Sequence, residues 1–206
     1  MENNFRCHFI GVAGVATAGK DTFCKLLSEK LHDVKRYALA DRLKSELSGF
    51  VRHYYGVDIM LCDAKTKEML RPLMLFHGLM MRARTEGQYW IRCLTEEIRK
   101  DNPEGTVVIT DIRYAQYGKN DEISWLKEKI GGCLVYINRH KVISGVKVYV
   151  DPPNVEEARN NEALKNSADY IIDWPTIYGS EDEVEEALEP YVDEFVDWYK
   201  KECPII

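Results

Sequence analysis

A glycine-rich segment near the N-terminus has the residue types and the spacing of a phosphate-binding loop. The nine residues are Gly14, Val15, Ala16, Thr17, Ala18, Gly19, Lys20, Asp21 and Thr22, and they match the pattern G-x-x-x-x-G-K. Glycines let consecutive backbone N–H groups curl around a phosphate, a following helix adds positive potential, and the lysine reaches the outer phosphates. All nine are therefore predicted to bind the phosphates of a nucleotide.

The end of this loop departs from its commonest form. Asp21 follows the lysine, where a serine or threonine usually binds Mg²⁺ directly, and the hydroxyl comes one position later at Thr22. This G-K-x-T form resembles nucleoside monophosphate kinases more than GTPase switches. We expect Mg²⁺ to be held largely through water and phosphate oxygens. Thr22 is a candidate metal contact, although it can equally be a helix-start residue.

An aspartate and an arginine follow the most strand-like segment of the chain. Residues 106–110 are Thr-Val-Val-Ile-Thr, and they lead directly into Asp111 and Arg113. Ligands bind beyond the carboxyl ends of parallel strands, so both side chains would face the phosphates. Asp111 would then orient magnesium-bound water, and Arg113 would clamp a phosphoryl oxygen. The alternative is a salt bridge at the strand end.

Strand-like and helix-like segments alternate along the chain. The expected strands are residues 5–13, 34–39, 106–110, 133–137 and 170–172. The expected helices are residues 20–33, 41–55, 64–85, 88–100, 121–130, 155–164 and 181–200, with Pro190 kinking or dividing the last one. This alternation predicts an α/β fold with a mainly parallel, five-stranded sheet.

Composition excludes several classes of protein. A length of 206 residues fits one domain spanning 1–206, and 45% hydrophobic with 30% charged residues excludes a disordered chain. No apolar run approaches the ~18 residues of a membrane span. Met1–Asn4 lacks a signal pattern and the six cysteines form no C-x-x-C pair, so a cytoplasmic protein with reduced thiols is expected. The net charge is −6, which argues against a protein that binds nucleic acid through an overall positive charge.

Five segments follow one another in an order that is typical of a known family. They are residues 14–22, 37–44, 71–82 followed by Tyr89-Trp90, 107–114 and 125–139. With them the chain resembles the bacteriophage deoxynucleoside monophosphate kinase family of P-loop kinases. The resemblance implies a three-layer sandwich with a helical acceptor-binding region at about 40–100 and a lid at about 139–167. Where the family has Gln and Gly-Thr, this chain has Leu75 and Gly78-Leu79, and residues 115–120 look like an insertion.

The resemblance also implies that basic residues of the helical region bind the acceptor phosphate. Arg71 and Arg82 are separated by about three helical turns, so they would share a face and line one pocket. Guanidinium groups bind a phosphate dianion bidentately. The predicted acceptor-binding residues are Arg42, Lys44, Arg71, Arg82, Trp90 and Arg113. Trp90 would stack on a base or, alternatively, belong to the core.

A polar stretch after residue 138 lies where the family carries its lid. Arg139 matches the lid-entry arginine, and Arg159 lies on the expected helix 155–164. Such arginines neutralise charge on the transferring phosphoryl group, although Arg159 can instead pair with Glu156 or Glu162. His140 is expected to be exposed. The predicted catalytic residues are Lys20, Asp111, Arg113, Arg139 and Arg159.

These inferences predict a kinase that uses ATP and Mg²⁺ to convert a deoxynucleoside monophosphate to the diphosphate. One rival is a kinase of another phosphorylated metabolite, such as phosphomevalonate, for which the animal-type enzyme has a similar layout. The other is a nucleotide-dependent switch or ATPase, disfavoured because Asp21 replaces the usual hydroxyl residue and no N-K-x-D motif is present. The expected partner is the small-molecule monophosphate, with no nucleic acid and no membrane. A homodimer is left open, and a phage-encoded chain would work in its host's cytoplasm.

Overall fold

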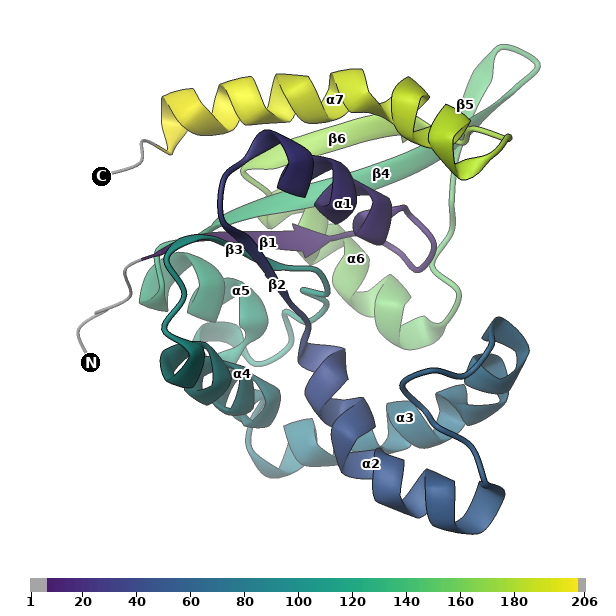
Figure 1. Ribbon diagram of the computed structural model, residues 1–206, viewed down its shortest axis with the longest axis vertical. Coiled ribbons are helices and arrows are strands. Elements are labelled where there is room, and N and C mark those ends of the chain that lie inside the picture. The colour runs from purple at the N-terminus through teal and green to yellow at the C-terminus, as the bar shows by residue number, and fades with distance from the viewer. Residues whose placement is uncertain (1–6, 204–206) are drawn as a thin grey trace.

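Five parallel strands form the centre of the molecule (Figure 1). The structure is a computed structural model and describes residues 7–203. The strands lie in the order β2 (Val34–Tyr37), β3 (Gly105–Ile109), β1 (Cys7–Ala13), β4 (Cys133–Ile143) and β6 (Tyr170–Pro175). The α/β fold with a mainly parallel sheet is thus confirmed. Residues 5 and 6 of the first expected strand, and the N-terminal segment Met1–Asn4, lie outside the described residues.

A sixth strand, which the sequence analysis did not predict, extends the sheet at one corner. Strand β5 (Val146–Tyr149) pairs antiparallel with the last residues of β4. Ser144 and Gly145 form the turn between them with φ of 51° and 80°, the positive values that a two-residue hairpin requires. The first part of the expected polar lid is therefore a β-hairpin. At its base His140 is buried against Asp173, so its expected exposure is wrong.

Helices cover both faces of the sheet. Helices α1 (Lys20–Lys30) and α7 (Glu181–Glu202) pack on one face. Helices α4 (Gln88–Asp101), α5 (Glu122–Ser124) and α6 (Val155–Ser167), with the π-helical segment η2 (Trp125–Lys129), pack on the other, and the short 3-10 turn η1 (Gly118–Asn120) precedes α5. Helix α7 runs through Pro190 as one helix, so the proline does not divide it. No helix in residues 7–203 combines the length and apolar character needed to cross a membrane.

The alternation of side chains along β1 explains why both faces are covered. Ile10 and Val12 point into the core shared with α1 and α7, where they pack with Phe23. Phe9 and Ala13 point into the opposite core, under α4 and η2. Since successive residues of a strand point to opposite faces, a strand that is apolar at every position must be buried on both sides.

Two helices reach away from the sheet and carry a small core of their own. Helix α2 (Leu39–Tyr55) starts directly after β2, and α3 (Ala64–Arg84) packs against it (Figure 1). Their shared core comprises Leu47, Val51, Ile59 and Leu70. Asp63 caps α3 by accepting the Thr66 N–H at 2.7 Å. These helices are the main part of the helical region that the sequence places at about 40–100.

The carboxyl ends of the three neighbouring strands lie at the same edge of the sheet. Tyr37 of β2 and Gly11 of β1 are both in register with Ile109 of β3. The chain leaves β1 into the glycine-rich loop, β2 into α2, and β3 into Asp111. This edge therefore brings together segments that are far apart in sequence, as expected for an open parallel sheet.

Two glycine substitutions are predicted to change stability in opposite directions. At Gly105 φ is +76° and a Cβ would lie 2.6 Å from Asp33 Cβ, so Gly105→Ala should lower the free energy of unfolding by about 1–3 kcal/mol. Gly49 lies inside α2 in open space, so Gly49→Ala should raise it by about 1 kcal/mol. Urea unfolding of both variants measures this. Equal stabilities would contradict the backbone described for Gly105.

Candidate functional site

The glycine-rich segment forms the turn between β1 and α1 that the sequence predicts. Gly14, Thr17 and Gly19 have φ of 142°, 64° and 94°, so the backbone curls on itself. Gly19 is the N-cap of α1 and no side chain caps it, which leaves the first N–H groups of the helix directed at the cleft. Trp174 of β6 supports the loop, because its Nε1 donates to Ala18 O at 2.8 Å.

Lys20 is folded back onto this loop. Its Nζ donates to the carbonyl oxygens of Gly14 and Val15, both at 2.8 Å. Burial, the largest cause, and the positive charge of Arg113 together lower its pKa to about 8, against the opposing effect of nearby carboxylates. Lys20 therefore still carries its charge at neutral pH. An incoming phosphate would offer it stronger acceptors than two neutral carbonyls.

Asp111 binds the start of α2 instead of another side chain. Its carboxylate accepts the N–H groups of Leu39 at 2.7 Å and Ala40 at 2.8 Å. The N-cap residue of α2 is Ala38, which has no side chain that could do so. Asp111 therefore supplies the cap from another part of the chain. Its predicted role in orienting magnesium-bound water stays a prediction.

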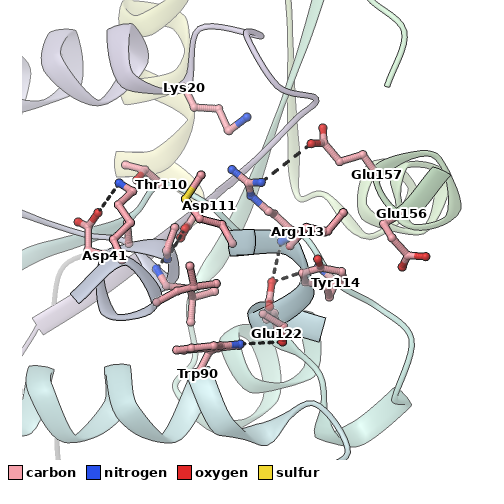
Figure 2. Close-up of a pocket in the computed structure, with 18 of the residues that line it drawn as sticks. Lys20, Asp41, Trp90, Thr110, Asp111, Arg113, Tyr114, Glu122, Glu156 and Glu157 are labelled. Atoms are coloured by element: carbon pink, nitrogen blue, oxygen red, sulfur yellow. Dashed lines mark hydrogen bonds and ion pairs between the residues drawn. The ribbon is translucent and has the colours of Figure 1, made fainter. Parts of the chain in front are cut away.

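A carboxylate from α6 lies against the phosphate loop. Glu157 Oε2 accepts the Ala16 N–H at 2.9 Å, and Glu157 Oε1 lies 3.9 Å from an Arg113 guanidinium nitrogen. Figure 2 shows Arg113 pointing toward Lys20 and Glu157. Glu157 thus uses a backbone donor of the kind that the loop is predicted to offer to phosphate.

Arg82 does not present its guanidinium to the cleft, contrary to its predicted role as a phosphate ligand. Its side chain is 2% exposed and pairs with Asp121 at 2.7 Å and Glu122 at 2.9 Å. The Tyr114 ring covers it at 3.8 Å from the guanidinium carbon. A guanidinium that is paired on both sides and buried holds the wall of the cleft together, so we assign Arg82 to that wall.

These parts meet at one cleft of about 240 Å³ (Figure 2). Of the predicted residues, Lys20, Asp21, Lys44, Arg71, Arg82, Trp90, Asp111 and Arg113 line it. Lys44 pairs with Asp41 at 3.1 Å and Arg71 with Glu68 at 2.8 Å, in both cases on the same helix. Trp90 is only 4% exposed and its Nε1 donates to Gly78 O, so the core alternative describes it better than stacking on a base.

Apart from residues 14–19 of the glycine-rich loop itself, four predicted residues do not line the cleft. Arg42 pairs with Glu46 on an exposed face of α2, and Arg159 pairs with Glu156, the surface alternative that the sequence analysis left open. Arg139 lies beside the phosphate loop and donates to Thr17 O at 2.7 Å. Thr22 is half-buried in the first turn of α1. The positions of these residues show that charge and helical spacing alone do not identify which way a long side chain points.

The sequence analysis did not predict six further charged residues that line the cleft: Arg36, Asp41, Lys67, Glu122, Glu156 and Glu157. Arg36 and Asp41 flank the end of β2, and they pair at 3.1 Å. Their position at the carboxyl end of a strand beside the phosphate loop was a usable signal. Glu157 had no such signal, because α6 lies far from the loop in sequence.

The residues present fit a magnesium ion held mainly by water and phosphate. Within residues 7–203, no group of three or more His, Cys, Asp or Glu side chains could hold a metal ion. Thr22 and Asp111 offer oxygen atoms at the edge of the sheet, which is the donor type that Mg²⁺ prefers. Thr22 and Asp111 remain the candidate contacts of an ion that would arrive with the phosphates, and this role stays a prediction.

Comparisons with known proteins give likenesses of structure only. The sequence matches no protein-family model and no curated protein. Dephospho-CoA kinase from Campylobacter jejuni is similar at 15% identity and a TM-score of 0.40, over 93% of this chain and 97% of that one. Shikimate kinase from Acinetobacter baumannii is similar at 13% identity and a TM-score of 0.44, over 94% and 96%. The tunicamycin resistance protein of Deinococcus radiodurans gives 12% identity and a TM-score of 0.35, over 92% and 96%. The fold assignment rests on the strand order and the loop described above.

Replacing Glu157 should strengthen the binding of a nucleoside triphosphate. A phosphate and the Glu157 carboxylate cannot use the Ala16 N–H together, so Glu157→Gln removes a competing anion. We expect the Kd for ATP to fall about five- to tenfold, measured by calorimetry, as for the loss of one charge-assisted hydrogen bond. Glu162→Gln, on an exposed position of the same helix, is the matched control and should change Kd less than twofold. Weaker ATP binding by Glu157→Gln would instead make Glu157 part of the nucleotide site.

Proposed function

We propose that this protein transfers the γ-phosphoryl group of ATP to a deoxynucleoside monophosphate. The observation that carries the proposal is that Lys20 of the phosphate loop and three cations of the helical region, Lys44, Lys67 and Arg71, open into the same cleft. A reaction that joins two phosphorylated substrates needs fixed positive charge facing both. No base or nucleophile of the protein is required, since phosphoryl transfer depends on positioning and charge.

The phosphate loop would bind the donor. Its curled backbone and the uncapped start of α1 direct N–H groups at one point, and Lys20 would exchange its carbonyl contacts for phosphate oxygens. Arg139 lies against Thr17 O and Thr176 Oγ1, so it adjoins the loop where the segment 139–167 would close over the nucleotide. Bound Mg²⁺ would neutralise phosphate oxygens, with Thr22 and Asp111 as its water-mediated contacts.

The helical region would bind the acceptor. Lys44 and Arg71 are paired within their own helices by ion pairs whose side chains are 21–66% exposed. Such pairs contribute only about 0–1 kcal/mol, so an incoming phosphate dianion replaces them at little cost. Arg113 lines the same cleft and lies near Glu157, and it would hold the phosphoryl group in transit.

One observation favours a second candidate acceptor. The apolar lining of the cleft is mostly aliphatic, with Leu39, Leu43, Met74 and Leu75, while Trp90 is buried. Aliphatic side chains pack against a nucleobase, but they also suit the hydrocarbon part of a phosphorylated aliphatic acid such as phosphomevalonate. A kinase of that class is therefore the second candidate.

The test is a coupled assay of ADP release over a panel of acceptors. The panel contains the four deoxynucleoside monophosphates, the corresponding ribonucleotides, unphosphorylated deoxynucleosides and phosphomevalonate. We expect turnover with at least one deoxynucleoside monophosphate and none with deoxynucleosides. Turnover with phosphomevalonate alone would support the second candidate, and ADP release that no acceptor stimulates would contradict both.

Lys20→Ala should abolish turnover without unfolding the protein. The change removes a charge that stabilises the transferring group, so kcat should fall at least about 100-fold. Since the Lys20 pKa is about 8, ATP binding by the unmodified protein should weaken as pH rises through 8, and Lys20→Ala should lack this dependence. Lys25→Ala, an exposed lysine of the same helix paired with Glu181 and Glu185, is the control. Near-normal kcat in folded Lys20→Ala would exclude a catalytic phosphate loop.

Arg71→Ala should weaken acceptor binding selectively. The loss of one charge-assisted contact to phosphate should raise KM for the monophosphate about tenfold or more, with KM for ATP nearly unchanged. Arg42→Ala removes an equal charge from outside the cleft and should leave both KM values nearly unchanged. If the two variants behave alike, the cleft cations do not recognise the acceptor.

A further inference from the structure

A buried group of three charged residues lies beneath the cleft. Arg82, near the end of α3, binds Asp121 Oδ1 and Glu122 Oε1, and all three side chains are at most 2% exposed. Asp111 is a further carboxylate near Glu122. Arg113 is a further cation, and its backbone N–H donates to Glu122. A buried charge is costly unless it is paired and hydrogen-bonded. The remaining oxygens of the two acids therefore need donors.

Those donors are backbone N–H groups of the loop after β3. Glu122 Oε2 accepts from Arg113 N at 2.6 Å and from Tyr114 N at 3.0 Å. Asp121 Oδ2 accepts in the same way from Gln116 N and Tyr117 N. Each acid thus has one oxygen on Arg82 and the other on two consecutive N–H groups. The loop 113–117 belongs to no helix or strand, so these bonds determine its path, together with the bond from Ala115 N to Asn160 Oδ1 at 3.0 Å.

The position of the Arg113 side chain depends on that path. Its side chain is 41% exposed, and its ion pair with Glu157 is long, at 3.9 Å. Among residues 7–203, no side-chain hydrogen bond and no shorter ion pair holds this guanidinium in the cleft. Figure 2 shows the Glu122 contact at the Arg113 backbone while the guanidinium extends toward Lys20. The Glu122 bond therefore fixes the point from which the guanidinium reaches the reacting phosphates.

We propose that Glu122, held by Arg82, is the positioning residue for Arg113, and that this pair couples acceptor helix α3 to the group that clamps the phosphoryl in transit. The inference deepens the proposed function and rests on it for its kinetic consequences. Glu122 touches no substrate in this account; it acts through the backbone of Arg113.

The ionised form of Glu122 is the one that can do this. The N–H groups of Arg113 and Tyr114 both point at Oε2. A proton on that oxygen would make it a donor that faces two other donors. Burial raises the Glu122 pKa to about 7, opposed by Arg82 and by the Arg113 N–H, and supported by the charges of Asp121 and Asp111. The positioning contact is therefore half-formed at about pH 7; it becomes complete as pH rises above that value and is lost as pH falls below it.

Glu122→Gln tests the proposal without relying on activity. In the unmodified protein the ¹⁵N–¹H signals of Arg113 and Tyr114 should titrate with a midpoint near pH 7, and in Glu122→Gln this titration should be absent. Glu128→Gln, an exposed acid of the following segment, is the control and should titrate as the unmodified protein does. Signals of residues 113 and 114 that titrate alike in all three proteins would overturn the inference. If Glu122→Gln does not fold, Arg82→Lys replaces it and should shift the midpoint.

Kinetics distinguish positioning from general support of the fold. Glu122→Gln should lower kcat about 10- to 100-fold and remove the acid limb of its pH profile, with KM for ATP within about twofold. In an Arg113→Ala background the same change should have almost no further effect. An equal loss in both backgrounds would make Glu122 a merely structural residue. If the unmodified protein transfers no phosphoryl group, the proposed function fails, while the amide titration still decides the Glu122–Arg113 contact.

Discussion

The arrangement of the cleft depends on the hydrogen bonds between Asp111 and the first turn of α2. The Asp111 carboxylate, buried at the end of β3, accepts the first two N–H groups of α2. The N-cap residue of that helix, Ala38, has no side chain that could accept them. The helix N-terminus in turn places positive potential beside this carboxylate. This single contact fixes where α2 leaves the sheet. Helix α3 packs on α2, so the contact also places the basic residues of both helices opposite the phosphate loop.

Most charged side chains of the cleft already bind another group of the protein before any ligand arrives. Seven cationic and six carboxylate side chains line it. Lys44 and Arg113 each lie near a carboxylate of the lining, and Arg71 pairs with a carboxylate just outside it. A phosphorylated ligand would therefore exchange partners with these groups instead of meeting bare cations. Exposed pairs are easily exchanged, whereas the buried group of Arg82, Asp121 and Glu122 is not. The exposed part of the charge is thus suited to binding, and the buried part to holding the shape.

The sequence predicts the features of this protein that depend on local spacing. The glycine pattern before Lys20 identifies the loop, and the β-branched run before Asp111 identifies a central strand. Prediction from the sequence fails where a long side chain can pair with more than one partner. Arg71 and Arg82 share a helix as expected, yet Arg82 turns toward Asp121 and Glu122, residues some forty positions away that no helical periodicity reveals. The β4–β5 hairpin was missed for a related reason: its exposed strands alternate valine with lysine without a buried face.

The central claim is that two phosphorylated substrates bind in one cleft, with their phosphates facing each other across Arg113. The most direct measurement is the affinity for a bisubstrate analogue, in which adenosine and a deoxynucleoside are joined through their 5′ oxygens by five phosphates. Calorimetry should give a Kd at least about 100-fold below that of ATP or of the monophosphate alone, because the second half binds at high effective concentration. A Kd no lower than that of ATP would contradict the account.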